Sequence, residues 1–128
     1  MPEHVELEVP SRPIHVRDAR RQVRAYASRW ELPDQVIEDL MLATSELVTN
    51  AIVHAESLVR LSITHYTDHV RLEVQDDHPR VPLASASDVE APSGRGLAIL
   101  HTISRSWGVE SIPGDGKRVW AELATAGQ

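Results

Sequence analysis

The 128-residue sequence contains no cysteine and no phenylalanine, and it has no apolar run of the 18 residues that suggest a membrane-spanning helix. The lack of cysteine excludes disulfides and thiolate-bound metal, and it is typical of a reducing, cytoplasmic location. Without phenylalanine, the core has to be built from Val, Leu, Ile and Ala with three Trp. The first residues, MPEHVELEVPSRP, carry charges where a signal peptide is apolar, so we expect no export.

The length suits a single domain, residues 1–128, with one core. The formal charge of −6 argues against broad, non-specific binding of nucleic acid. Arginines are nevertheless concentrated between Arg17 and Arg24, within an amphipathic pattern that predicts a helix from His15 to Trp30. We interpret these arginines as a solvated helix face, with a partner-binding surface as the alternative.

A second helix is predicted over Glu38 to His54, EDLMLATSELVTNAIVH, where apolar residues recur at spacings of three and four. Glu46, Asn50 and His54 are four residues apart and therefore share one face close to the apolar stripe. An acid and an amide at buried positions each need a partner, because unpaired burial is costly. They either cap loops and bond to neighbouring backbone, or they bind a ligand.

Alternation of apolar and polar residues predicts the strands. They lie around Val5–Val9, Leu58–Tyr66, His69–Asp76, Trp107–Val109 and Val119–Leu123. Residues 77–93 carry three prolines and predict a loop, after which Leu97 to Ile103 suits a third helix. The turn Pro113 to Gly116 precedes the last strand, and residues 124–128 are expected to fray. This order favours α+β, a two-layer sandwich with helices on one face of a mixed, mainly antiparallel sheet.

Four motifs occur in a characteristic order: SELVTNAIVHA, VQDD at a strand end, SGRGLAIL and GDGKRVW. Together they resemble the GHKL ATPase superfamily, and in particular its small, stand-alone anti-sigma-factor serine kinases. The similarity covers a core of about residues 16–123. It implies a Bergerat-type ATP-binding fold with three main helices, and ATP and Mg²⁺ as cofactors. It also implies protein partners, namely a sigma factor or an anti-sigma-factor antagonist, and by analogy a homodimer; nucleic acid and membrane are not expected partners.

The resemblance assigns roles in the first motif to Asn50 and Glu46. Asn50 matches the asparagine that ligates Mg²⁺, and an amide oxygen beside phosphates suits that ion. Glu46 matches the catalytic acid that orients or deprotonates the attacking group, a serine hydroxyl or a water. His54, one turn further on, is interpreted as structural.

Asp76 matches the aspartate that hydrogen-bonds the amino group of adenine. A carboxylate accepts from that amine and offers no donor to the carbonyl of guanine, so it would select adenine. The alternative is that Asp76 only ends a strand, a common position for aspartate.

The glycine motif supplies the expected phosphate contacts. Gly94 and Gly96 match glycines that let backbone amides approach phosphate at the start of a helix, here followed by Leu97. Arg95 either adds a charged contact or points to solvent. Lys117 matches less specifically, as a turn cation before the last strand.

The sequence departs from the superfamily pattern after Asp76. His78 and Arg80 replace the two glycines of Asp-x-Gly-x-Gly, and a Cβ at such positions can block close approach, so we expect an altered adenine pocket. The segment that matches the family's lid, residues 81–93, is short and is expected to close over the phosphates.

Three functions therefore compete. The first is an ATP- and Mg²⁺-binding anti-sigma-type regulator that phosphorylates a serine or threonine of an antagonist protein. The second is a GHKL-fold interaction module, weak or inactive as a catalyst, that regulates transcription by binding partners. The third is the detached ATPase domain of a phosphorelay histidine kinase, which the lack of a phospho-acceptor helix pair disfavours. The retention of both Glu46 and Asn50 favours the first.

Overall fold

The computed structural model describes residues 2–55, 58–76, 96–112 and 116–125, apart from the side chains of His54, Gly96 and Leu97. The elements in chain order are β1 (Glu3–Pro10), the 3-10 turn η1 (Pro13–His15), α1 (Val16–Arg29), α2 (Asp34–His54), β2 (Leu58–His65), β3 (His69–Asp76), α4 (Gly96–Ile103), β4 (Ser106–Ile112) and β5 (Gly116–Ala124). Apart from η1, this is the order expected from the sequence. Across the described ranges, no helix combines the length and the apolar character needed to cross a membrane.

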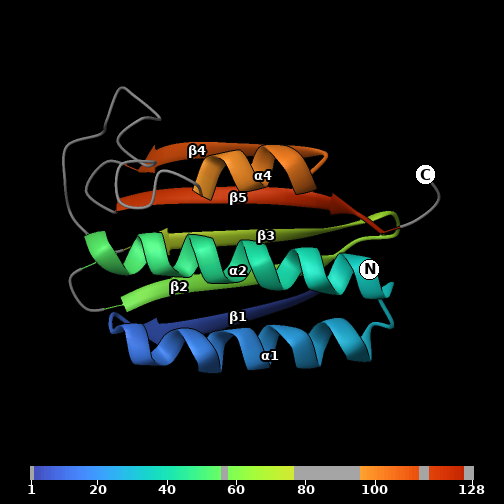
Figure 1. The fold of residues 1–128 in the computed structure, drawn as a ribbon, viewed down its shortest axis with the longest axis horizontal. Helices are drawn as coiled ribbons and strands as arrows, with labels where there is room; N and C mark the ends of the chain where they lie inside the picture. The colour runs from blue at the N-terminus through green and yellow to red at the C-terminus, as the bar shows by residue number, and fades with distance from the viewer. Residues whose placement is uncertain (1, 56–57, 77–95, 113–115, 126–128) are drawn as a thin grey trace.

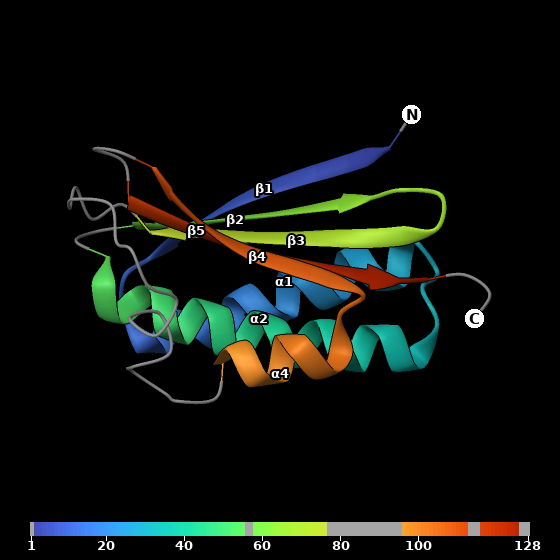
Figure 2. The same cartoon turned by 90° about the horizontal axis from the view of Figure 1, so that it is seen from above.

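The strands form one five-stranded sheet in the order β1-β2-β3-β5-β4. All four pairings between neighbours are antiparallel. The helices α1, α2 and α4 cover the same face of this sheet, with α2 between the other two (Figures 1 and 2). The predicted two-layer α+β sandwich is confirmed.

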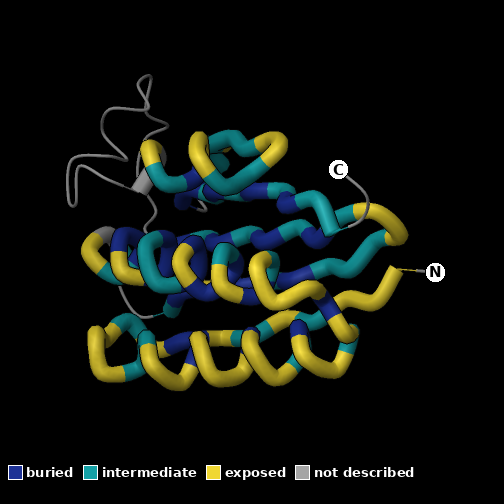
Figure 3. The backbone as a smooth tube through the Cα atoms, turned by 45° about the vertical axis from the view of Figure 1, so that its right-hand side comes forward, coloured by how far each residue is buried: buried dark blue, intermediate teal, exposed yellow. Residues whose placement is uncertain are grey.

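The core fills the space between the helices and the sheet, while the outer faces of α1 and α2 are exposed (Figure 3). In α1, Ala19, Val23 and Ala27 are buried at intervals of four residues, and the arginines point outward as predicted. The expected aliphatic core is confirmed, but the expectation of Trp in it is not. Trp30 and Trp107 are only partly buried against the core, and Trp120 lies on the other face of the sheet.

A left-handed turn joins α1 to α2 and reverses the chain. Glu31 has φ of +57°, its N–H donates to Ser28 O at 2.9 Å, and the N–H of Leu32 donates to Ala27 O at 3.1 Å. These bonds form a Schellman motif, in which glycine is the usual left-handed residue. Pro33 follows at the N-cap of α2 and directly precedes its first residue, Asp34.

The C-terminal strand extends further than expected. Ala124 pairs with His69, and the N–H of Thr125 donates to Asp68 O at 3.0 Å. The prediction of fraying is therefore wrong for residues 124 and 125, because the β2–β3 hairpin offers them backbone partners; residues 126–128 lie outside the described part.

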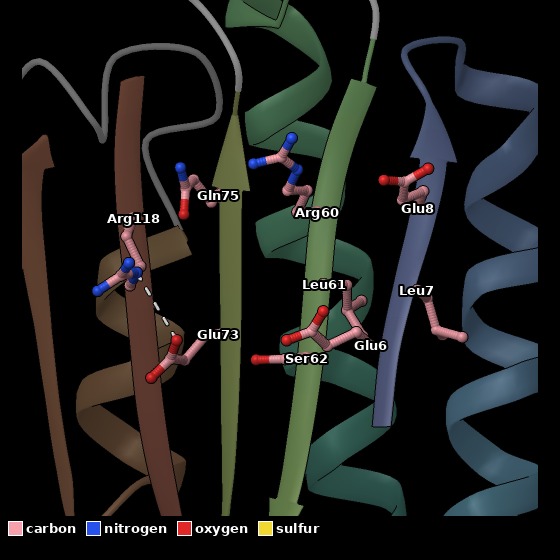
Figure 4. A pocket seen from close by; sticks show the side chains of 9 residues that line it. All are labelled: Glu6, Leu7, Glu8, Arg60, Leu61, Ser62, Glu73, Gln75 and Arg118. Atoms are coloured by element: carbon pink, nitrogen blue, oxygen red, sulfur yellow. Dashed lines mark ion pairs between the residues drawn. The ribbon is translucent and has the colours of Figure 1, made fainter. Parts of the chain in front are cut away.

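The helices leave one face of the sheet uncovered (Figure 2), and most of the side chains labelled in Figure 4 on this side are polar. Cross-strand pairing aligns one row over all five strands: Glu8, Arg60, Gln75, Arg118 and Glu110. Arg118 forms ion pairs with Glu110 at 3.0 Å and with Glu73 at 3.6 Å. A broad cavity of about 530 Å³ lies over this face.

Arg71 organises the rest of this outer face. Its guanidinium lies 4.2 Å from the ring centre of Trp120 and donates to Glu73 at 2.7 Å and to Glu122 at 2.9 Å. Burial opposes the charge of Arg71, but the hydrogen bonds to the two carboxylates outweigh it and raise its pKa. Arg71 and Arg118 are thus both held by carboxylates on this face.

Candidate functional site

The second half of α2 places Glu46 and Asn50 one turn apart. Leu47, Val48 and Ala51 are buried in the core and so fix the rotation of the helix about its axis. As a result Asn50 is only 6% exposed, whereas Glu46 is half-buried near the surface. Of the predicted pair, Asn50 therefore lies inside the protein and Glu46 lies near its surface.

The C-terminal end of α2 is held by the chain that follows β1. The hydroxyl of Ser11 donates to the carbonyls of Ile52 at 3.2 Å and Ala55 at 3.3 Å, and the N–H of Ala55 donates to Ala51 O at 2.8 Å. These bonds satisfy carbonyls that a helix end leaves without an intrahelical partner. They anchor the turn of α2 that carries Asn50.

Asp76 ends β3 and lies against the first residue of β5. Its side chain is 2% exposed. Gly116 has φ of +91°, and a Cβ at this position would lie 2.5 Å from Oδ1 of Asp76 and collide with its carbonyl oxygen. Only glycine satisfies both constraints. From the sequence, Gly116 was interpreted only as part of a turn, because its contact with Asp76 is remote along the chain.

Asn50, Asp76 and Lys117 meet at a small cavity between α2, β3 and β5. The cavity has a volume of about 20 Å³, and its other walls are apolar: Leu47, Ala51, Val74 and Val119. Lys117 is 5% exposed, so its description as a turn cation is wrong; it is a buried residue of β5.

Asn50 carries a polar atom that the described part of the protein leaves unsatisfied. Its Nδ2 is buried and has no hydrogen-bond partner among the described residues. Burial of such a group costs about 1–3 kcal/mol, so a native site that retains one calls for an explanation. A ligand in the cavity would supply the missing partner.

The elements that carry Glu46 and Gly96 converge with this cavity at one end of the molecule. The end of α2, the end of β3 and the beginnings of β5 and α4 all lie at this end (Figure 1). Glu46 does not line the cavity but precedes Asn50 by one turn. Gly96 is the first residue of α4 and Leu97 the second, so the helix begins within the glycine motif as predicted.

Some predictions fall on residues that the structure does not describe. These are Gly94, Arg95, the loop of residues 77–93 with His78 and Arg80, and the side chains of His54 and Leu97.

The larger cavity on the outer face has a different character. Its lining, from Glu6 and Glu8 on β1 to Arg118 on β5, includes none of the predicted site residues (Figure 4). Arg118 in that cavity is paired with Glu73, whereas Asn50 in the small cavity has an unsatisfied amide. We therefore place the candidate site at the small cavity despite its size.

Comparison with known proteins agrees with the fold. Residues 9–123 match the model of the histidine kinase-like ATPase domain. A chain from the crystal structure of the SiaB-SiaC complex from Pseudomonas aeruginosa shares the fold, with a TM-score of 0.63, 11% identity, and coverage of 94% of this chain and 89% of that chain.

Characterised relatives are similar in sequence. The anti-sigma F factor of Caldanaerobacter subterraneus subsp. tengcongensis is 28% identical over 127 residues, which cover 90% of this chain and 89% of that protein. The serine-protein kinase RsbW of Bacillus velezensis is 29% identical over 130 residues, 88% of this chain and 81% of that protein. RsbW of Oceanobacillus iheyensis is 32% identical over 79 residues, 58% of this chain but only half of that relative's length. Because the family match spans nearly all of the sequence, this chain belongs to the histidine kinase-like (GHKL) ATPase domain family, with similarity to its anti-sigma-factor kinases.

Proposed function

We propose that this chain is an ATP- and Mg²⁺-binding regulator of the anti-sigma-factor type, which transfers a phosphoryl group to a serine or threonine of an antagonist protein. The observation that carries the proposal is the meeting of Asn50 and Asp76 at one cavity, one turn of α2 from Glu46. The relatives named as anti-sigma F factor and serine-protein kinase support the same function. Its partners would be a sigma factor, the antagonist, and a second copy of the chain.

Asp76 suits the recognition of a base. It is an acceptor at the inner end of an apolar-walled cavity, where water competes poorly for its hydrogen bonds. A purine amine could donate to it while Leu47, Val74 and Val119 contact the ring. Gly116 keeps the approach to the carboxylate open on the β5 side.

Asn50 suits a metal bound to the nucleotide phosphates. Its Oδ1 is a hard oxygen ligand of the kind that Mg²⁺ takes, and its unsatisfied Nδ2 can donate to a phosphate oxygen. When bound, Mg²⁺ would neutralise charge on the phosphates. We expect the phosphates near the start of α4, where Gly94, Arg95, Gly96 and Leu97 would supply backbone N–H groups and the arginine a charge.

Glu46 suits proton transfer from a protein substrate. It lies on the same face of α2 as Asn50 but is half-buried and outside the cavity, so an incoming hydroxyl can reach its carboxylate. In this position it would accept the proton of the serine as the oxygen attacks the γ-phosphate.

The metal role is tested by Asn50→Ala. The substitution removes an unsatisfied polar group, so we expect the free energy of unfolding to change by less than about 1 kcal/mol. We expect the affinity for ATP with Mg²⁺ to fall about tenfold and the affinity without Mg²⁺ to fall by less, because without the metal only the hydrogen bond from Nδ2 to phosphate is lost. Calorimetric titration with and without Mg²⁺ measures both values. The exposed neighbour Thr49→Ala is the matched control, and an equal loss in both conditions would remove Asn50 as a ligand.

One observation favours the alternative, an interaction module without phosphoryl transfer. A cavity of about 20 Å³ holds about one water molecule, far less than a purine base. The site has to widen before it admits a nucleotide. A chain in which it stays closed would act by protein binding alone.

A further inference from the structure

Lys117 lies beside Asp76 across the pairing of β3 with β5. Gln75 pairs with Arg118, so the next antiparallel position sets Asp76 opposite Lys117. Gln75 and Arg118 face the outer cavity, whereas Asp76 and Lys117 face the helices and line the small one. The cavity thus contains an acceptor-only group and a donor-only group at adjacent positions.

Both groups are buried and line the cavity. Asp76 is 2% exposed and Lys117 5% exposed, and Nζ of Lys117 is itself buried. A buried ammonium is costly unless an opposite charge lies near it, and the carboxylate of Asp76 lines the same cavity. The remaining wall is largely apolar, so hydrogen bonds from this pair to a ligand would be little weakened by water.

The edge of an adenine ring has the complementary pattern, with the N6 amine as donor next to the N1 acceptor. We propose that Lys117 is a second base-recognising residue, which donates from Nζ to N1 of adenine while Asp76 accepts from N6. This inference rests on the proposed function and assigns a specificity role within the same site. Guanine in that orientation presents a carbonyl to Asp76 and an N–H to Lys117, so both contacts become repulsive.

The side chain of Lys117 is also able to make room for the base. Its four-methylene stem can move Nζ aside without moving the backbone of β5, which Val119 and Ala121 hold in the core.

Nucleotide analogues test this assignment on the unaltered protein. In 1-deaza-ATP a C–H replaces N1, and in 7-deaza-ATP the change lies on the other side of the ring, so N1 is kept. We expect the protein to bind 1-deaza-ATP about tenfold more weakly than 7-deaza-ATP, the cost of one charge-assisted hydrogen bond.

The Lys117→Met variant should bind ATP more weakly than the unaltered protein by a similar factor, and it should bind ATP and 1-deaza-ATP alike. Arg118→Met is the control, because this neighbouring cation points to the outer face.

Three results would overturn the assignment. Equal affinity of the unaltered protein for 1-deaza-ATP and 7-deaza-ATP excludes a contact at N1 and leaves the proposed function intact. Because this comparison uses the unaltered protein, it tests the contact even if Lys117→Met does not fold. Tighter ATP binding by folded Lys117→Met would show that the lysine obstructs the pocket. No ATP binding by the unaltered protein would refute the proposed function and this inference together.

Discussion

Glu46→Gln is expected to abolish phosphoryl transfer to the antagonist while ATP binding is retained. The amide keeps the size of the side chain but cannot accept a proton, and general-base catalysis contributes about 100-fold or more to such reactions. Because Glu46 is half-buried and does not line the cavity, its loss should leave nucleotide affinity within about twofold. The two quantities are measured by intact mass of the antagonist after incubation with Mg²⁺ and ATP, and by calorimetric titration.

The control for this change is Glu38→Gln. Glu38 is an exposed carboxylate two turns earlier on α2, in an ion pair with Arg24 at 3.5 Å. Loss of an exposed pair costs little, so transfer should be unaffected. If Glu46→Gln transfers the phosphoryl group at the rate of the unaltered protein, Glu46 is not the base. The proton of the attacking hydroxyl would then be accepted by water or by a different side chain.

Gly116→Ala is expected to damage both the fold and the site. A side chain at φ of +91° is strained, and its Cβ would collide with the backbone oxygen and the carboxylate of Asp76. We expect a loss of about 3 kcal/mol in the free energy of unfolding and a fall of about 10 °C in Tm. We also expect ATP binding to be lost, since Asp76 has to move. Thermal unfolding and titration measure the two effects.

Gly108→Ala is the control for Gly116→Ala, because it separates the cost of a crowded side chain from damage to the nucleotide site. A Cβ at Gly108 would also be tight, at 2.8 Å from the ring of Trp120, but the contact is a side chain on the open face. Trp120 can shift there, so we expect a loss of about 1 kcal/mol and unchanged ATP affinity. If Gly116→Ala kept the Tm and the affinity of the unaltered protein, the close packing of β5 on Asp76 would not matter to the site.

The fold was predictable from the sequence because its elements are strongly patterned. The spacing of Ala19, Val23 and Ala27 and the alternation in β2 and β3 are local signals, and the structure follows them. The form of the turn after α1 was not predicted. Glu31 takes the left-handed position usually held by glycine, so the Schellman turn had no recognisable residue.

The site was predictable only in part, because its contacts are non-local. Asn50 and Asp76 could be named from their motifs, but their approach to Lys117 depends on the register of β3 against β5. Charge alone predicts an exposed lysine, although the alternation of Val119, Ala121 and Leu123 extended back along the strand places Lys117 on the buried face. The same register decides that Trp120 faces outward, where Arg71 covers its ring.

The central claim, an adenine-nucleotide site at Asp76, is tested most directly by calorimetric titration with ATP and with GTP, each with and without Mg²⁺, for the unaltered protein and for Asp76→Asn. We predict saturable binding of ATP that Mg²⁺ strengthens, weaker binding of GTP, and about a tenfold loss of ATP affinity in Asp76→Asn. No binding at millimolar nucleotide would contradict the account and would identify the chain as a protein-interaction module of the same fold.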